Sequence, residues 1–113
     1  MDMKQTLISG LPELKLDLTQ AQIDTLCAFG QAVIDQNQVM NLTAITEPQQ
    51  VAKLHLLDSL TVLSALDLRG KSLIDVGCGA GFPGVPLAIA SPQTQVTLLD
   101  SLGKRVNWLK EIL

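Results

Sequence analysis

DVGCGAGFPG, residues 75–84, carries the strongest structural signal in the chain. It overlaps the end of an apolar run at residues 72–76, which predicts a short buried strand. Four of its last eight residues are glycine, which adopts positive φ angles and lets a ligand approach the backbone closely. Residues 85–90 then have the composition of a helix. A strand, a glycine-rich turn and a helix in this order predict the start of a nucleotide-binding α/β fold.

A second strand and a further helix are predicted downstream. Residues 95–100 form another apolar run that ends at Asp100, and residues 103–113 have the apolar spacing of a helix. A carboxylate at the end of the second strand can accept hydrogen bonds from the hydroxyls of a ribose. Two parallel strands make an incomplete doubly wound sheet with bare edges. We therefore expect the chain to be part of a longer protein.

The residues before the first strand predict helices only. Residues 1–16 are amphipathic, and a break is expected near Gly10 and Pro12. A turn centred on Gly70 separates this part from the strands. We therefore expect a helical subdomain at residues 1–70 and the start of a nucleotide-binding domain at residues 71–113.

A capping box predicts where the second helix begins. Thr19 is a good N-cap residue, and Gln22, three residues on, is its partner. Apolar residues at spacings of three and four continue this helix to about Asn37. Gly30 lies on the apolar face, where the absence of a side chain allows close contact with another helix. Cys27 is expected to be buried on the same face.

A third helix is predicted after a polar connector at residues 38–46. Thr46 is expected to begin it, with Pro48 in the first turn, and it is expected to end near Leu66. Its apolar side chains recur along one face, which predicts a contribution to the core. The residues in this stripe are Val51, Leu54, Leu57, Leu60 and Leu63.

Composition limits the classes of protein and site. The formal net charge is −3, and neither part of the chain is the strongly basic surface of an autonomous nucleic-acid binder. Cys27 and Cys78 lack the spacing of a zinc site, so no metal is expected, and nothing recommends a disulfide between them. No signal peptide and no membrane-spanning run is recognised, which makes the cytoplasm the expected location.

The spacing of the glycines distinguishes two classes of cofactor. A dinucleotide fingerprint, G-x-G-x-x-G, fails from Gly77 but matches from Gly79 through Gly81 and Gly84. In that register Pro83 lies inside the motif. The pattern acidic-x-G-x-G-x-G fits from Asp75 onward without interruption.

This second pattern resembles motif I of class I S-adenosylmethionine-dependent methyltransferases. Such a cofactor carries no phosphate, and its ammonium group suits the acidic side chain of Asp75. The methyltransferase interpretation is favoured, and an NAD(P)-binding oxidoreductase fragment is the alternative.

Longer stretches resemble one family of methyltransferases. NLT at residues 41–43, HLLDSL at 55–60 and DVGCGAGFPGVPL at 75–87 are similar to the GidB family, also called ribosomal RNA small subunit methyltransferase G. LDSLGKR at residues 99–105 fits as well. The resemblance extends over nearly the whole chain from about Asp24.

The resemblance implies methyl transfer from S-adenosylmethionine to guanine N7 of 16S rRNA by a monomeric enzyme with a Rossmann-like fold. Guanine N7 has a free lone pair and no proton, so no catalytic base is expected. The implied cofactor-binding residues are those of the glycine loop and the second strand end. They are Asp75, Gly77, Gly79, Gly81, Phe82 and Asp100. Members of the family continue through several more strands, so residues 1–113 alone are expected to be inactive. A non-catalytic binding module is a further alternative.

Several side chains allow two interpretations. His55, the only histidine, is interpreted as structural support for the cofactor loop with Asp58 and Ser59 rather than as a catalyst. Phe82 packs within the loop or contacts the cofactor. Lys104 and Arg105 are solvated or touch RNA phosphates. Asn41 is expected to brace a turn.

Overall fold

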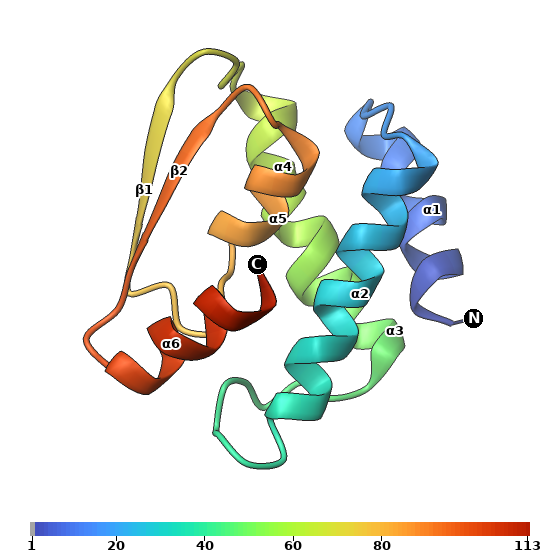
Figure 1. Ribbon diagram of the computed structural model, residues 1–113. Coiled ribbons are helices and arrows are strands. Elements are labelled where there is room, and N and C mark those ends of the chain that lie inside the picture. The colour runs from blue at the N-terminus through green and yellow to red at the C-terminus, as the bar shows by residue number, and fades with distance from the viewer. Residues whose placement is uncertain (1) are drawn as a thin grey trace.

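The computed structural model describes residues 2–113. Helices occupy the first half of the chain, and strands alternate with helices in the second (Figure 1). The elements are α1 (Met3–Leu14), α2 (Gln20–Gln36), α3 (Pro48–Val51), η1 (Ala52–Leu57), α4 (Asp58–Ala65), β1 (Ser72–Val76), α5 (Gly84–Ala90), β2 (Gln95–Leu99) and α6 (Gly103–Ile112). No helix of this described part is long and apolar enough to cross a membrane.

The two strands pair in parallel, as the sequence predicts, with Ser72 opposite Gln95 and Val76 opposite Leu99. α5 contacts both strands from one side and also contacts α4 and α2 (Figure 1). The other face of the sheet carries exposed side chains, including Ile74 and Val76. The chain is therefore a mixed α/β structure with a two-stranded parallel sheet.

The core lies where α1, α2 and the middle of the chain meet. Leu7, Leu26, Val33 and Leu56 are fully buried there. Gly30 makes the predicted close contact, because a Cβ atom on it would lie 2.8 Å from the Met3 sulfur. One cluster of buried side chains runs from α1 to α6. The boundary near residue 70 stays a prediction.

The predicted break in the first helix is wrong. α1 continues through Gly10 and Pro12 to Leu14. Gly10 packs against Leu57, so the missing side chain serves a helix contact rather than a break. Pro12 has no N–H group to donate to the carbonyl four residues earlier, yet the helix continues past it for two residues. The helix ends at Leu14 and is capped by Lys15, whose φ of 56° is left-handed and whose N–H bonds to the carbonyls of Leu11 and Pro12.

The predicted third helix begins at a different residue from the one expected, and a different set of its side chains is buried. Glu47, not Thr46, is the N-cap residue, and its side chain makes no capping bond. Residues Ala52–Leu57 form a π-helix, which needs more residues per turn than an α-helix. The buried face therefore passes through Val51 and Leu56, while Leu54 is 52% exposed. The prediction of a buried Leu54 is wrong.

The two cysteines are free. Cys27 is only partly buried, contrary to the expectation of a buried position, because it lies at the border of the apolar face of α2. Cys78 is buried within the glycine loop.

Candidate functional site

The glycine loop begins where β1 ends. Gly77, Gly79 and Gly81 have φ angles of 73°, 55° and 103°, which favour glycine over every other residue. The N–H groups of Gly77 and Cys78 both donate to the carbonyl of Leu99, at 2.7 and 2.9 Å. The loop is thus fastened to the end of β2, and the three glycines adopt a backbone conformation that residues with side chains rarely adopt.

The glycines differ in what surrounds them. No atom lies within 4 Å of a Cβ built on Gly77 or Gly79, so these two positions face open space. A Cβ on Gly81 would meet Val85 at 2.9 Å and Phe29 at 3.0 Å. A Cβ on Gly84 would lie 2.9 Å from the Asp75 carboxylate. A ligand can therefore approach the loop backbone at Gly77 and Gly79, whereas Gly81 and Gly84 are packed against protein.

Asp100 joins the loop to the end of the second strand. Its Oδ2 accepts the Gly79 N–H at 2.7 Å and pairs with Arg105 at 3.3 Å, and its Oδ1 accepts the Leu102 N–H at 3.0 Å. The N–H of Leu102, followed by that of Gly79, lowers the pKa of the Asp100 carboxyl. The side chain is 4% exposed. Three of roughly four lone-pair directions on the carboxylate are occupied, so about one remains for a further donor.

Asp75 joins β1 to α5. Its Oδ2 accepts the Gly84 N–H at 2.9 Å. Burial raises the pKa of this carboxyl, against the opposing effect of the Gly84 N–H. The Asp75 carboxylate thus links β1 to the first residue of α5, which directly follows the loop.

The first turn of α5 has few N–H groups to offer an anion. The Gly84 N–H is bonded to Asp75, and the Val85 N–H donates to the carbonyl of Gly81 at 2.7 Å. Pro83 precedes them and Pro86 follows, and neither has an N–H group. Phosphate binding at a helix N-terminus needs free N–H groups, so this helix start does not fit a pyrophosphate.

Phe82 turns from the loop toward the helical part of the chain. Its ring centroid lies 5.3 Å from that of Phe29 on α2 and 4.4 Å from that of His55 on η1. Contact with a cofactor through this side chain stays a prediction. The interpretation of His55 as a support for the loop agrees with this stacking.

Thr43 and Asn37 hold the connector between α2 and α3. Asn37 Oδ1 accepts the N–H groups of Leu42 and Thr43 at 2.8 and 2.9 Å. Asn37, not Asn41, thus makes these bracing bonds, because it ends α2 beside the connector. Sequence reasoning missed this, although an asparagine at a helix end before a polar stretch is a known turn signal.

The cations after β2 have different positions. Arg105 is paired with Asp100, whereas Lys104 is exposed. Both line a cavity of about 500 Å³ with Leu102 and the connector at residues 38–41. This cavity lies beside the carboxyl ends of the strands, where parallel α/β sheets bind ligands.

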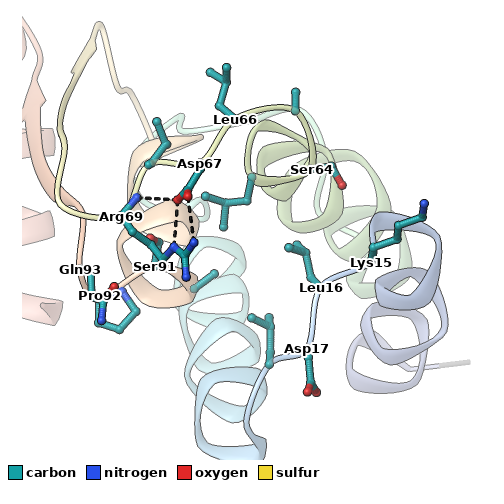
Figure 2. A pocket seen from close by; sticks show the side chains of 15 residues that line it. Lys15, Leu16, Asp17, Ser64, Leu66, Asp67, Arg69, Ser91, Pro92 and Gln93 are labelled. Carbon is teal, nitrogen blue, oxygen red and sulfur yellow. Dashed lines mark hydrogen bonds and ion pairs between the residues drawn. The ribbon is translucent and has the colours of Figure 1, made fainter.

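A larger cavity lies elsewhere. It measures about 730 Å³ and lies before the strands begin, between residues 15–18, 63–69 and 90–93 (Figure 2). Asp67 and Arg69 pair on its rim at 2.9 Å, and the bonds from Arg69 lower the pKa of the Asp67 carboxyl to about 2. Ligands of parallel α/β sheets bind at the opposite, carboxyl ends of the strands, so size alone does not mark this cavity as the site. Within residues 2–113 no cluster of acidic, cysteine and histidine side chains could hold a metal ion.

Comparison with known proteins shows the family of the chain. Residues 22–113 match the GidB family model, described as rRNA small subunit methyltransferase G. A relative from Lachnoclostridium phytofermentans, named ribosomal RNA small subunit methyltransferase G, is 45% identical over 96% of this chain and 45% of its own length. Relatives of the same name from Alkaliphilus oremlandii and Haemophilus ducreyi are 46% and 43% identical.

These two matches cover 99% and 98% of this chain but only 47% and 54% of the relatives. The chain thus spans about half the length of the curated relatives it matches. Since the family model covers most of the chain and the identities hold over nearly all of it, the chain belongs to the GidB family.

Proposed function

We propose that the protein carrying this chain transfers a methyl group from S-adenosylmethionine to N7 of a guanine in 16S rRNA, with a Rossmann-like class I methyltransferase fold. The names of the relatives support rRNA methylation. The cofactor and the guanine atom rest on the family resemblance and on the loop. The proposed substrate agrees with a cytoplasmic protein acting on the small ribosomal subunit.

The observation that carries the choice of cofactor is the surroundings of the glycines. A dinucleotide register would require Gly81 to face the pyrophosphate, but Gly81 is packed against Val85 and Phe29. The first N–H groups of α5 are already bonded. Gly77, which faces open space, belongs only to the acidic-x-G-x-G-x-G register, whereas Gly79 and Gly81 belong to both registers. A nucleoside cofactor without phosphate fits this loop better than NAD(P).

The residues of the chain would hold the cofactor rather than take part in proton transfer. Gly77 and Gly79 offer a backbone surface, and the remaining lone-pair direction of Asp100 can accept a ribose hydroxyl. Asp75 stabilises the end of the loop by accepting the N–H of Gly84. When bound, S-adenosylmethionine supplies an electrophilic methyl group. Guanine N7 has no proton to remove, so placement of the two reactants is the main task, and proximity of this kind can contribute about 7–11 kcal/mol.

Two assays test the proposal on the protein expressed from its complete coding sequence. Titration with S-adenosylhomocysteine and with NADH measures the choice of cofactor, and we expect tight binding of the first only. Labelled S-adenosylmethionine with 16S rRNA or small subunits should yield N7-methylguanine in a nuclease digest. Tighter binding of NADH would refute the cofactor assignment. Cofactor binding without any methyl transfer would favour a non-catalytic module.

A pair of variants tests the site itself. Asp100→Ala removes the acceptor beside Gly79 and should weaken S-adenosylhomocysteine binding by about tenfold or more. Asp67→Ala is the matched control, because Asp67 also pairs with an arginine but lies at the other end of the strands. Equal affinities of the two variants would contradict the role of Asp100.

A further inference from the structure

The ring of His55 lies flat against the ring of Phe82. The centroids are 4.4 Å apart and the planes differ by 8°. Phe29 contacts Phe82 at 5.3 Å with the rings tilted by 59°. Phe82 follows Gly81 directly in the glycine loop. Phe29 on α2 and His55 on η1 thus both contact the loop through the side chain of Phe82.

His55 is itself held in place from the other side. Its Nε2 lies 2.8 Å from Oγ1 of Thr43. Thr43 Oγ1 also accepts the Ile45 N–H at 3.1 Å, and the Thr43 N–H is bonded to Asn37. The ring therefore has a fixed orientation, because both its flat face and its edge have partners.

The π-helical segment η1 sets the direction of His55. The wider turn lets Val51, Ala52 and Leu56 all reach the core, where each is fully buried. Leu54 is then exposed, and the ring between Leu54 and Leu56 is directed at Phe82. The His55 carbonyl accepts bonds from the Asp58 N–H and from the Ser59 hydroxyl. π-helical turns occur frequently at functional sites.

The environment of His55 favours an uncharged ring. Burial lowers the pKa of the imidazole, against a smaller opposing effect of the Asp58 carboxylate. Asp58 is the one charged neighbour among the described residues that share its cavity; the others are Leu54, Ser59, Thr61, Val62, Phe82 and Pro83. A neutral ring stacked on an aromatic ring supplies contact and rigidity rather than charge.

We propose that His55 is a positioning residue for the cofactor loop, acting through Phe82. Three glycines with positive φ make the loop intrinsically flexible in the unbound state. Stacking of His55 on Phe82 holds the loop in the conformation that leaves Gly77 and Gly79 open. The cofactor then binds without bearing the entropic cost of ordering the loop. This inference rests on the proposed function, because it assigns a role at the same site.

Binding of S-adenosylhomocysteine to variants of the full protein tests this role. His55→Ala removes the stack and should weaken binding by about threefold to tenfold. His55→Phe keeps a flat ring and should bind within about twofold of the unmodified protein. His55→Gln keeps a polar group without the ring and should behave as His55→Ala.

Leu57→Ala is the matched control for general loss of stability. Leu57 lies two residues further along the same segment but packs against Gly10 on α1, away from the loop. We expect it to lower the melting temperature while leaving cofactor affinity unchanged. If Leu57→Ala weakened binding as much as His55→Ala at a similar loss of melting temperature, the positioning role would be refuted.

A double variant tests whether the effect passes through Phe82. In a Phe82→Leu background, His55→Ala should change the affinity by less than about twofold, because the ring it supports is gone. The same weakening in both backgrounds would overturn the inference, as would unchanged binding by His55→Ala alone. If the unmodified protein failed to bind S-adenosylhomocysteine, the proposed function would fail first. The two failures are therefore distinguishable.

Discussion

Single residues of the loop have separate structural tasks. Gly77 and Gly79 have positive φ angles and face open space, whereas Gly84 has no Cβ because α5 starts against β1 and β2. Asp75 and Asp100 each bond to an N–H group on the loop or just after it. The two carboxylates therefore hold the loop at Gly79 and at its junction with α5.

Gly84→Ala should destabilise the protein. The new Cβ would clash with the Leu98 side chain and would lie 2.9 Å from the Asp75 carboxylate and 3.1 Å from the Asp75 Cβ, which is attached directly to the β1 backbone. Overpacking of this kind costs about 1–3 kcal/mol, which urea unfolding can measure. Gly103→Ala is the control, because nothing lies within 4 Å of its added Cβ. Equal stability of the two variants would contradict the close packing at Gly84.

His55 should make stability depend on pH in mildly acidic solution. Its pKa in the folded state is lowered from 6.5 by burial, so the unfolded chain binds more protons than the folded chain between the two pKa values. The free energy of unfolding therefore rises with pH in this window, and stability is lost as the pH falls below about 6.5. Protonation must then occur in an environment that disfavours the charge.

His55→Phe isolates this effect, because it removes the imidazole and keeps a ring at the site. Urea unfolding at pH 7.5 and pH 5.5 should show a smaller loss of stability in the variant than in the unmodified protein. An equal loss in both proteins would assign the pH dependence to other groups.

Helix starts follow local rules in some elements and tertiary contacts in others. α2 begins with the predicted capping box, in which Thr19 Oγ1 accepts the Gln22 N–H at 3.1 Å and Gln22 Oε1 accepts the Thr19 N–H at 2.8 Å. α3 begins without a side-chain cap and continues into a π-helix, which allows five-residue spacing between Val51 and Leu56. In this segment, the burial of Val51 and Leu56 outweighs the local preference for a regular α-helix.

Thr19→Ala should lower the free energy of unfolding of the protein, because it removes the N-cap side chain of α2. Removing a threonine cap costs about 1 kcal/mol. Thr25→Ala, in the same helix, is the control, because its exposed hydroxyl bonds only to the Ala21 carbonyl of the preceding turn. Thermal or urea unfolding of both variants measures the difference, and an unchanged stability of Thr19→Ala would show that the capping box is not needed.

Within residues 2–113, the sheet has an exposed apolar face. Ile74, Val76 and Leu99 are 62%, 77% and 49% exposed on the outer face of β1 and β2 (Figure 1). The inner face is packed against α5. Adjacent exposed apolar side chains on a sheet favour association.

Residues 1–113 expressed alone should therefore self-associate. Sedimentation should show a mass that rises with concentration, and Ile74→Lys with Val76→Lys should reduce this rise. Gln95→Lys is the control, because Gln95 lies on the same face at its polar end. If the chain were monomeric at all concentrations, self-association through the outer face of the sheet would be refuted.

The local part of the fold follows from short-range rules. Both strands, the loop glycines and the capping box of α2 were predictable because each depends on neighbours within a few residues. The pattern from Asp75 to Gly81 likewise predicted the loop, and the class of cofactor that it favours stays a prediction.

Long-range packing determined the aromatic contacts, the exposure of each glycine and the π-helical turn. These features depend on residues that come into contact only in the folded chain. Phe29, His55 and Phe82 are far apart in the chain yet form one aromatic cluster. No pattern within a few residues of Gly77 and Gly81 showed that the first faces open space and the second faces Phe29. The π-helical turn at His55 arises in the same way, since burying Val51 and Leu56 together outweighs the local preference for an α-helix.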